Sequence, residues 1–267
     1  MPQQKPKLRA REIVFAVLLG GLAAGGAALT ISLMDDDQMA FVGPGSAVAG
    51  PSEMTYELAP FEAITTAGPQ DIVVTFGDEI SVRSEGSPRA LSLLEAKVEN
   101  GRLSIGPPDG FNWGGWGQLE SATFYVTLPR LDSINLAGSG DVRIDKIEGE
   151  RLEVVVGGPG ELAIAELAVD EADFTVAGAG NIVAAGSARE ARVTVAGAGE
   201  IQAGGLRSET ASIQIGGAGD VALTVDREAQ VSIIGTGDVS ISGPAQCSLT
   251  RVGNGELICN GVEIVPN

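Results

Sequence analysis

Hydrophobic and polar residues alternate in a block that recurs seven times between residues 131 and 259. Each block centres on glycine, any residue, glycine, then Asp, Glu or Asn. Apolar residues stand six and four positions before the second glycine and two and four after it. Of these 28 positions 27 are apolar, against about 12 expected from a hydrophobic share of 44%, and the exception is Arg251. The second glycines follow one another at steps of 18 to 20 residues: Gly140, Gly160, Gly180, Gly199, Gly219, Gly237 and Gly255.

This alternation predicts two strands around each glycine corner, with the variation in length confined to a loop on the far side. A repeat of this size cannot bury an apolar face alone and must stack on its copies. We therefore expect an all-β fold, a parallel β-helix (β-solenoid) of about seven rungs of 18–20 residues. Parallel crossovers are overwhelmingly right-handed, which predicts the hand of the winding. An antiparallel sandwich stays open as an alternative, although identical corners at every step disfavour it.

The segment before the repeats also resembles β structure. We expect residues 55–130 to form the N-terminal part or cap of the β-helix and residues 131–267 the repetitive solenoid. Strands are predicted at residues 72–76 and 80–83, and one or two helical turns within residues 87–96, where Ser and Pro precede a Leu-rich run. Asn100-Gly101 predicts a hairpin turn.

Residues 13–33 form a 21-residue run without a charge, long enough to span a bilayer as a helix. Four basic residues precede it within residues 1–12, and three aspartates follow it at once. We expect a cytoplasmic tail (1–12), a transmembrane signal anchor (13–34) and a flexible linker (35–54). The chain would then be a single-pass protein of the bacterial inner membrane with its bulk in the periplasm. A cleaved signal peptide and a buried soluble helix are the alternatives.

Charge and composition exclude several classes of function. The formal charge is −18, and the chain beyond residue 12 carries 13 basic and 34 acidic residues. Such a surface repels nucleic acid. The sequence contains no histidine, which excludes Ser-His triads and His-ligated zinc. We expect no cofactor and no enzymatic activity. A carbohydrate-active enzyme is a weaker alternative, because steps of 18–20 residues leave no room for the loops that would wall a substrate groove.

The residues that follow the second glycines form an acidic column on the stacked rungs. One interpretation is a Ca²⁺-binding strip. The other, which we favour, is that these side chains accept hydrogen bonds from turn amides and otherwise face water. The column mixes chain lengths and lacks the nine-residue period of calcium-loaded solenoids, so we expect no metal site. Its members are Asp141, Glu161, Asn181, Glu200, Asp220, Asp238 and Glu256.

Three further features are candidates for specific roles. Trp113 and Trp116 lie in one loop, where they either contact a sugar or protein partner or cap the first rung. Cys247 and Cys259 stand on opposite sides of the last corner, and in an exported protein they predict a disulfide, with two reduced thiols as the alternative. Arg251 either reaches solvent at the end of the solenoid or serves a buried partner.

Several stretches resemble a known family. LPRLDSINLAGSGDV (residues 128–142) with the GAG corners after it, FEAITTAGPQDIVVTFGD (61–78) and VENGRLSI (98–105) are similar to the "putative auto-transporter adhesin, head GIN domain" family, over about residues 56–264. The resemblance implies a right-handed parallel β-helix on bacterial envelope proteins and supplies no catalytic residues. We expect a non-enzymatic, membrane-anchored envelope protein whose solenoid presents a surface for adhesion or for protein or glycan binding. The alternative is a structural envelope module or assembly subunit, and the oligomeric state stays open.

Overall fold

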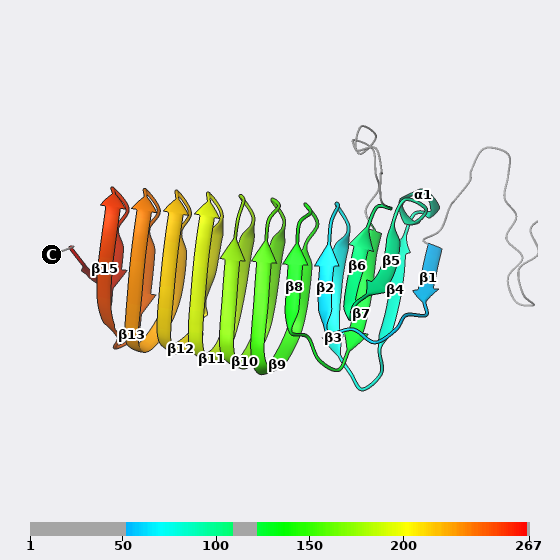
Figure 1. Ribbon diagram of the computed structural model, residues 1–267, viewed down its shortest axis with the longest axis horizontal. Coiled ribbons are helices and arrows are strands. Elements are labelled where there is room, and N and C mark those ends of the chain that lie inside the picture. The colour runs from blue at the N-terminus through cyan, green and yellow to red at the C-terminus, as the bar shows by residue number, and fades with distance from the viewer. Residues whose placement is uncertain (1–51, 109–121, 266–267) are drawn as a thin grey trace, which may run out of the picture. The chain divides into compact units, whose positions relative to one another are not determined.

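The computed structural model describes residues 52–108 and 122–265, which all belong to the compact unit formed by residues 49–267. The described strands join in one hydrogen-bonded sheet that winds into a β-solenoid of about six turns, with a single short helix among these residues (Figure 1). We expected about seven rungs, one more than the structure has. The hand of the winding stays a prediction.

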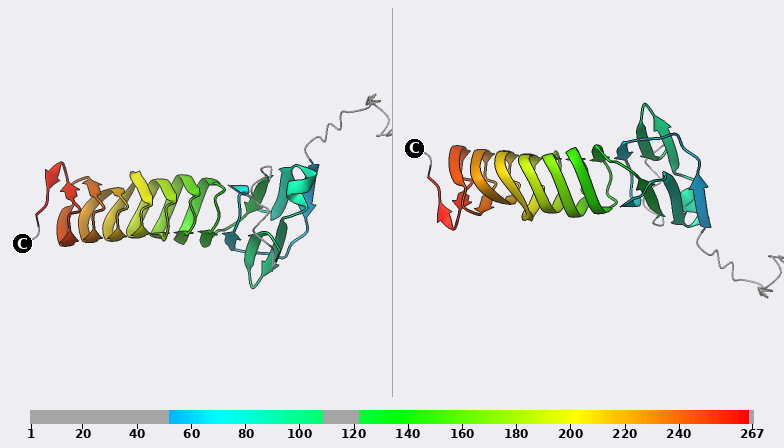
Figure 2. Two further views of the ribbon diagram at one scale, coloured as in Figure 1. Left: turned by 90° about the horizontal axis from the view of Figure 1, so that it is seen from above. Right: turned by 90° about the horizontal axis from the view of Figure 1, so that it is seen from below.

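The repetitive part is built from long parallel strands that lie side by side in chain order (Figures 1 and 2). Each strand pairs in parallel with the one a turn earlier, which excludes the antiparallel sandwich. The strands are β9 (Val142–Val156), β10 (Glu161–Val176), β11 (Asn181–Gly197), β12 (Glu200–Gly217), β13 (Val221–Gly235), β14 (Val239–Ser242) and β15 (Gln246–Gly253). The chain then forms β16 (Leu257–Cys259), which is parallel to β14, and β17 (Val262–Glu263), which is antiparallel to β16.

The predicted core positions are confirmed. Of the 28 inward positions, 26 are buried, and only Leu249 and Arg251 of the last turn are partly exposed. The corner glycines fix the phase of the strands on both sides, so simple alternation identifies every apolar position near them.

The expected loop on the far side is wrong, because the strands continue through it and close the core with a third wall. Without that wall the apolar interior would be open on one side. Irregularities in the pairing, for example between Ile164 and Leu167, absorb the different lengths of the turns. The buried apolar residues of this wall are Ile147, Leu152, Leu167, Val169, Ala172, Ala188, Ala191, Leu206, Ala211, Val225, Ala229 and Ala245.

The N-terminal strands do not stack in chain order. Strand β2 (Ala63–Thr66) lies between β6 (Arg102–Gly106) and β8 (Ser133–Leu136), and β3 (Asp71–Phe76) lies between β7 (Ala122–Leu128) and β9. Residues 63–76 therefore form one more turn of the solenoid, with Gly68-Pro69-Gln70-Asp71 as its corner. Beyond it, β4 (Ser81–Gly86) pairs antiparallel with both β7 and β1 (Ser52–Tyr56).

Two local predictions in this part are confirmed. Helix α1 (Pro88–Leu91) is a single turn capped by Ser87, whose Oγ accepts a hydrogen bond from the Ala90 amide at 3.1 Å. Strand β5 (Glu95–Glu99) forms an antiparallel hairpin with β6. The turn residues Asn100 and Gly101 have φ of 52° and 73°, as a type I′ turn requires.

The predicted tail, membrane anchor and most of the linker lie outside the described residues. Within residues 52–108 and 122–265, no helix is long and apolar enough to cross a membrane.

Candidate functional site

A ladder of hydrogen bonds follows the acidic column from turn to turn. Asp71 of the extra corner is its first member. In this ladder the side chain of an Asp or Asn accepts a hydrogen bond from the backbone N–H of the next column residue. The donor–acceptor distances are 2.9 Å (Asp141 N to Asp71), 3.3 Å (Glu161 N to Asp141), 3.2 Å (Glu200 N to Asn181), 2.8 Å (Asp238 N to Asp220) and 2.8 Å (Glu256 N to Asp238).

The glutamates of the column do not take part as acceptors. After Glu161, the amide of Asn181 donates instead to the carbonyl of Gly160 at 3.1 Å. Turn stabilisation by short side chains is the role that the hydrogen-bond interpretation predicted. A groove of about 250 Å³ runs over Glu200, Asp220, Asp238 and Glu256. Among the described residues, no three acidic or cysteine side chains converge closely enough to hold a metal ion.

At each end of the stack of corners, a polar side chain donates a hydrogen bond to a backbone carbonyl. Gln70 stands where later corners have their second glycine, and its Nε2 donates to Thr66 Oγ1 (2.8 Å) and to the carbonyl of Ile105 (3.2 Å). At the other end Arg251 Nη1 donates to the carbonyl of Gly255 at 2.9 Å. The corresponding carbonyl of Gly160 accepts an amide from the next turn. Arg251 therefore supplies the donor that a further turn would have supplied.

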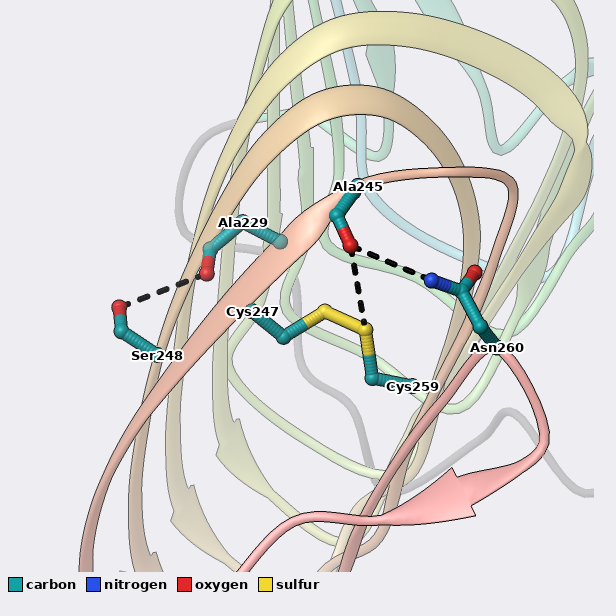
Figure 3. Close-up of a disulfide and its surroundings, with 6 residues drawn as sticks. All are labelled: Ala229, Ala245, Cys247, Ser248, Cys259 and Asn260. Atoms are coloured by element: carbon teal, nitrogen blue, oxygen red, sulfur yellow. Dashed lines mark hydrogen bonds between the residues drawn. A yellow bond between two sulfur atoms is a disulfide. The ribbon is translucent and has the colours of Figure 1, made fainter.

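A disulfide joins Cys247 to Cys259, with their Cα atoms 6.4 Å apart (Figure 3). Cys247 pairs with Ala229, in the inward column of the third wall, and Cys259 pairs with Ile241 of the preceding turn. Next to the disulfide, Asn260 Nδ2 donates to the carbonyl of Ala245 at 3.2 Å. The bond thus crosses the core at the end of the last turn, where no further turn covers it.

The outward face of β9, β10 and β11 carries a network of ion pairs. Arg192 contacts Glu190 at 2.6 Å and Glu171 at 3.3 Å. Arg151 contacts Glu171 at 3.4 Å and Asp173 at 2.5 Å. The charges on this part of the face therefore contact one another across neighbouring turns.

The same face carries fewer charges over β12, β13 and β15, where Glu228 remains and accepts a hydrogen bond from Gln230 Nε2 at 2.9 Å. A hollow of about 350 Å³ lies there, and we call it the neutral hollow. Its polar lining consists of uncharged hydroxyl and amide side chains from three successive turns: Ser212, Gln214, Gln230, Ser232, Ser248 and Thr250. The sequence analysis missed this site, because alternation marks these positions only as polar. The available signal was the change from charged to neutral residues at equivalent positions, as from Asp173 and Arg192 to Ser212.

Trp113 and Trp116 lie outside the described residues, in the segment between β6 and β7. Neither their predicted capping role nor a contact with a partner is tested by the structure.

Solved structures of proteins from Bacteroides and Parabacteroides share the fold. A "putative adhesin" from Bacteroides fragilis has a TM-score of 0.72 at 21% identity, covering 78% of this chain and 96% of its own. A "putative lipid binding protein" from Parabacteroides distasonis has a TM-score of 0.64 at 20% identity, covering 79% and 96%. A "putative adhesin" from Parabacteroides merdae has a TM-score of 0.63 at 17% identity, covering 79% and 96%.

The comparison of sequences leads to the same family as the resemblance stated above. No curated protein matches this chain. The sequence profile described as "Putative auto-transporter adhesin, head GIN domain" matches residues 60–245, which is more than half of the chain. This protein is therefore a member of the head GIN domain family.

Proposed function

We propose that this protein is a non-enzymatic binding module of the bacterial envelope and that the neutral hollow is its contact surface for a neutral glycan. The observation that carries the proposal is the hollow itself, an uncharged polar surface on a chain with a formal charge of −18. Membership of an adhesin-like family supports a binding role.

The chemistry of the hollow suits a ligand rich in hydroxyl groups. Hydroxyl and amide side chains both donate and accept hydrogen bonds, so Gln214 can pair with sugar hydroxyls of either polarity. Gln230 donates through its Nε2 to Glu228 at 2.9 Å and offers its Oε1 as an acceptor. They project from parallel strands spaced about 4.8 Å apart, which fixes their positions before a ligand arrives. Such preorganisation lowers the entropy lost on binding. On the neighbouring turns, Arg151 and Arg192 already contact Glu171, so these charges do not compete for the ligand.

The absence of a catalytic mechanism is part of the proposal. The chain has no histidine. The side chains that line the hollow do not titrate near neutral pH, and the adjacent carboxylate of Glu228 accepts a hydrogen bond from Gln230. Turnover of a polysaccharide that one acidic substitution abolishes would overturn this part.

Anchoring also belongs to the proposal. The uncharged run at residues 13–33 would hold the chain in the inner membrane, with the solenoid in the periplasm. We expect the winding to be right-handed, as parallel crossovers are. A protease protection assay on intact spheroplasts tests the topology, because residues 49–267 should be digested from outside.

A glycan array probed with the full-length chain tests the binding role. We expect the double variant Gln214→Ala/Gln230→Ala to lose at least ~10-fold in affinity, since two hydrogen-bonding groups are removed. Gln202→Ala is the matched control, because Gln202 is also an exposed glutamine of β12 but lies outside the hollow. Unchanged binding in the double variant would contradict the hollow as the site. Loss of binding only in Trp113→Ala/Trp116→Ala would transfer the site to the tryptophan segment.

A structural module is the second candidate, and the ion pairs across β9, β10 and β11 favour it, because they brace neighbouring turns. In that case no glycan binds, and deletion of the gene changes envelope integrity instead of attachment.

A further inference from the structure

Exposed apolar side chains gather at the C-terminal end of the solenoid. Among the described residues, five of the six exposed large hydrophobic side chains lie after residue 233: Ile234, Val252, Ile258, Val262 and Val265. Ile234 and Val252 are 62% and 65% exposed. We call Ile234, β15, Ile258, Val262 and Val265 the tip.

The apolar character is specific to the last turns. Ile234 and Val252 pair with each other and continue a column that contains Ala196 and Gly216 in earlier turns. In the earlier turns this column faces water with small residues, so the fold needs no large side chain there. Two large aliphatic side chains in its last two positions are exposed at a cost in solubility, and concentrated exposed apolar surface marks contact sites.

The tip also contains an open strand edge. Strand β15 pairs with β13 on one side, and no strand in the described part of the chain pairs with its other side. The neighbouring edge of β16 is covered by the antiparallel β17. The residues of β15 include one arginine and no acidic residue, in a chain that is strongly acidic elsewhere. An edge of eight residues without acidic charge is a template for another strand.

The two ends of the solenoid differ, which restricts how copies can associate. At the opposite end, β1 pairs antiparallel with β4, and its Glu53 contacts Arg83 at 3.5 Å. Both side chains of this ion pair are exposed. Head-to-tail stacking would place these charges against the apolar tip, whereas a contact between two tips would not.

We propose that two copies of this chain join tip to tip, with their β15 strands paired antiparallel about a two-fold axis. Main-chain hydrogen bonds between the two edges provide the pairing, and Ile234 and Val252 of both copies lose contact with water. Such an isologous contact uses the same surface twice and closes at a dimer. If the N-termini are anchored as proposed above, the pair links two surfaces. That adhesive role depends on the proposed function, but the dimer does not.

Sedimentation velocity of the full-length chain in detergent, over a concentration series, tests the proposal. We expect a reversible monomer–dimer equilibrium, and hydrogen exchange in residues 246–253 should slow as the dimer forms. The double variant Ile234→Lys/Val252→Lys should raise the dimer dissociation constant at least ~10-fold, because unpaired charges would be buried. Both positions are exposed in the monomer, so the fold should tolerate the lysines.

Ala196→Lys is the matched control, since it adds a lysine to the same exposed column three turns from the end. It should leave the dimer unchanged. A monomer at all concentrations, a species that grows beyond a dimer, or a dimer that the tip lysines leave intact would each overturn the proposal. A chain that stays monomeric at all concentrations and still binds glycan would overturn the dimer while supporting the proposed function.

Discussion

Alanine at the corner Gly219 should destabilise the fold strongly. A Cβ at this position would lie against the carbonyl oxygen of Gly199 and 2.6 Å from Val195 Cγ1, both in the preceding turn. The carbonyl belongs to the backbone of a stacked turn and cannot rotate away. Overpacking costs typically 1–3 kcal/mol, and we expect the upper limit, about 3 kcal/mol. For a unit of this size that corresponds to a fall in Tm of about 6–12 °C.

Guanidinium chloride unfolding measures this cost, and Gly216→Ala at the end of β12, three residues before the corner glycine, is the control. At Gly216 the nearest atom to an added Cβ is the Val195 oxygen at 3.9 Å, an ordinary contact. This alanine should be neutral or stabilise by up to about 1 kcal/mol, because it restricts the unfolded chain. The close-approach argument fails if the two variants differ by less than about 0.5 kcal/mol at equal m-values.

Three further predictions follow from the hydrogen-bond ladder, the disulfide and the exposed ion pairs. Asp220→Ala should lower the free energy of unfolding by about 1 kcal/mol more than Glu200→Ala, because only Asp220 accepts a hydrogen bond from the next turn, and equal losses in urea titrations would refute this. Reducing the Cys247–Cys259 disulfide should lower the stability of the last turn by about 2–3 kcal/mol, seen as faster hydrogen exchange there, and unchanged exchange would contradict it. A hydrogen bond from Arg207 lowers the pKa of Asp226, so this pair stabilises the fold above the carboxyl's ordinary pKa, and the contribution is lost as the pH falls through the lowered value. Carbon-detected NMR titration should show Asp226 titrating below the ordinary pKa of an aspartate, and titration at that ordinary value would contradict the prediction.

The core of the repeats could be predicted because one constraint determines it. Where two turns stack within contact distance, only glycine fits at the corner, and strand alternation then assigns the residues on both sides. Gln70 shows the limit of this reasoning. It replaces the second glycine of the first corner, so a search for glycine pairs missed the turn formed by residues 63–76. The third wall was missed for a related reason, since shifts in the pairing hide its period.

The neutral hollow could not be predicted from the period at all. Stacking requires only that outward residues tolerate water, and Asp173 and Ser212 satisfy that requirement equally well. The choice between a charged and an uncharged residue at an outward position depends on what the surface contacts. A single sequence does not show what the surface contacts. The hollow therefore becomes visible only when three turns are placed side by side.

The residues that depart from the repeat pattern are of two kinds. Some satisfy polar groups of the folded chain, and others have no such role within the chain. Gln70 and Arg251 depart from the pattern and each satisfies a polar group of the chain itself, so the needs of the folded chain explain them. Ile234 and Val252 also depart from it, yet both are more than half exposed. Replacing them with small residues would remove exposed apolar surface without uncovering the core. Because the fold does not require these two side chains, their exposure beside the open edge of β15 supports the proposed contact between two tips.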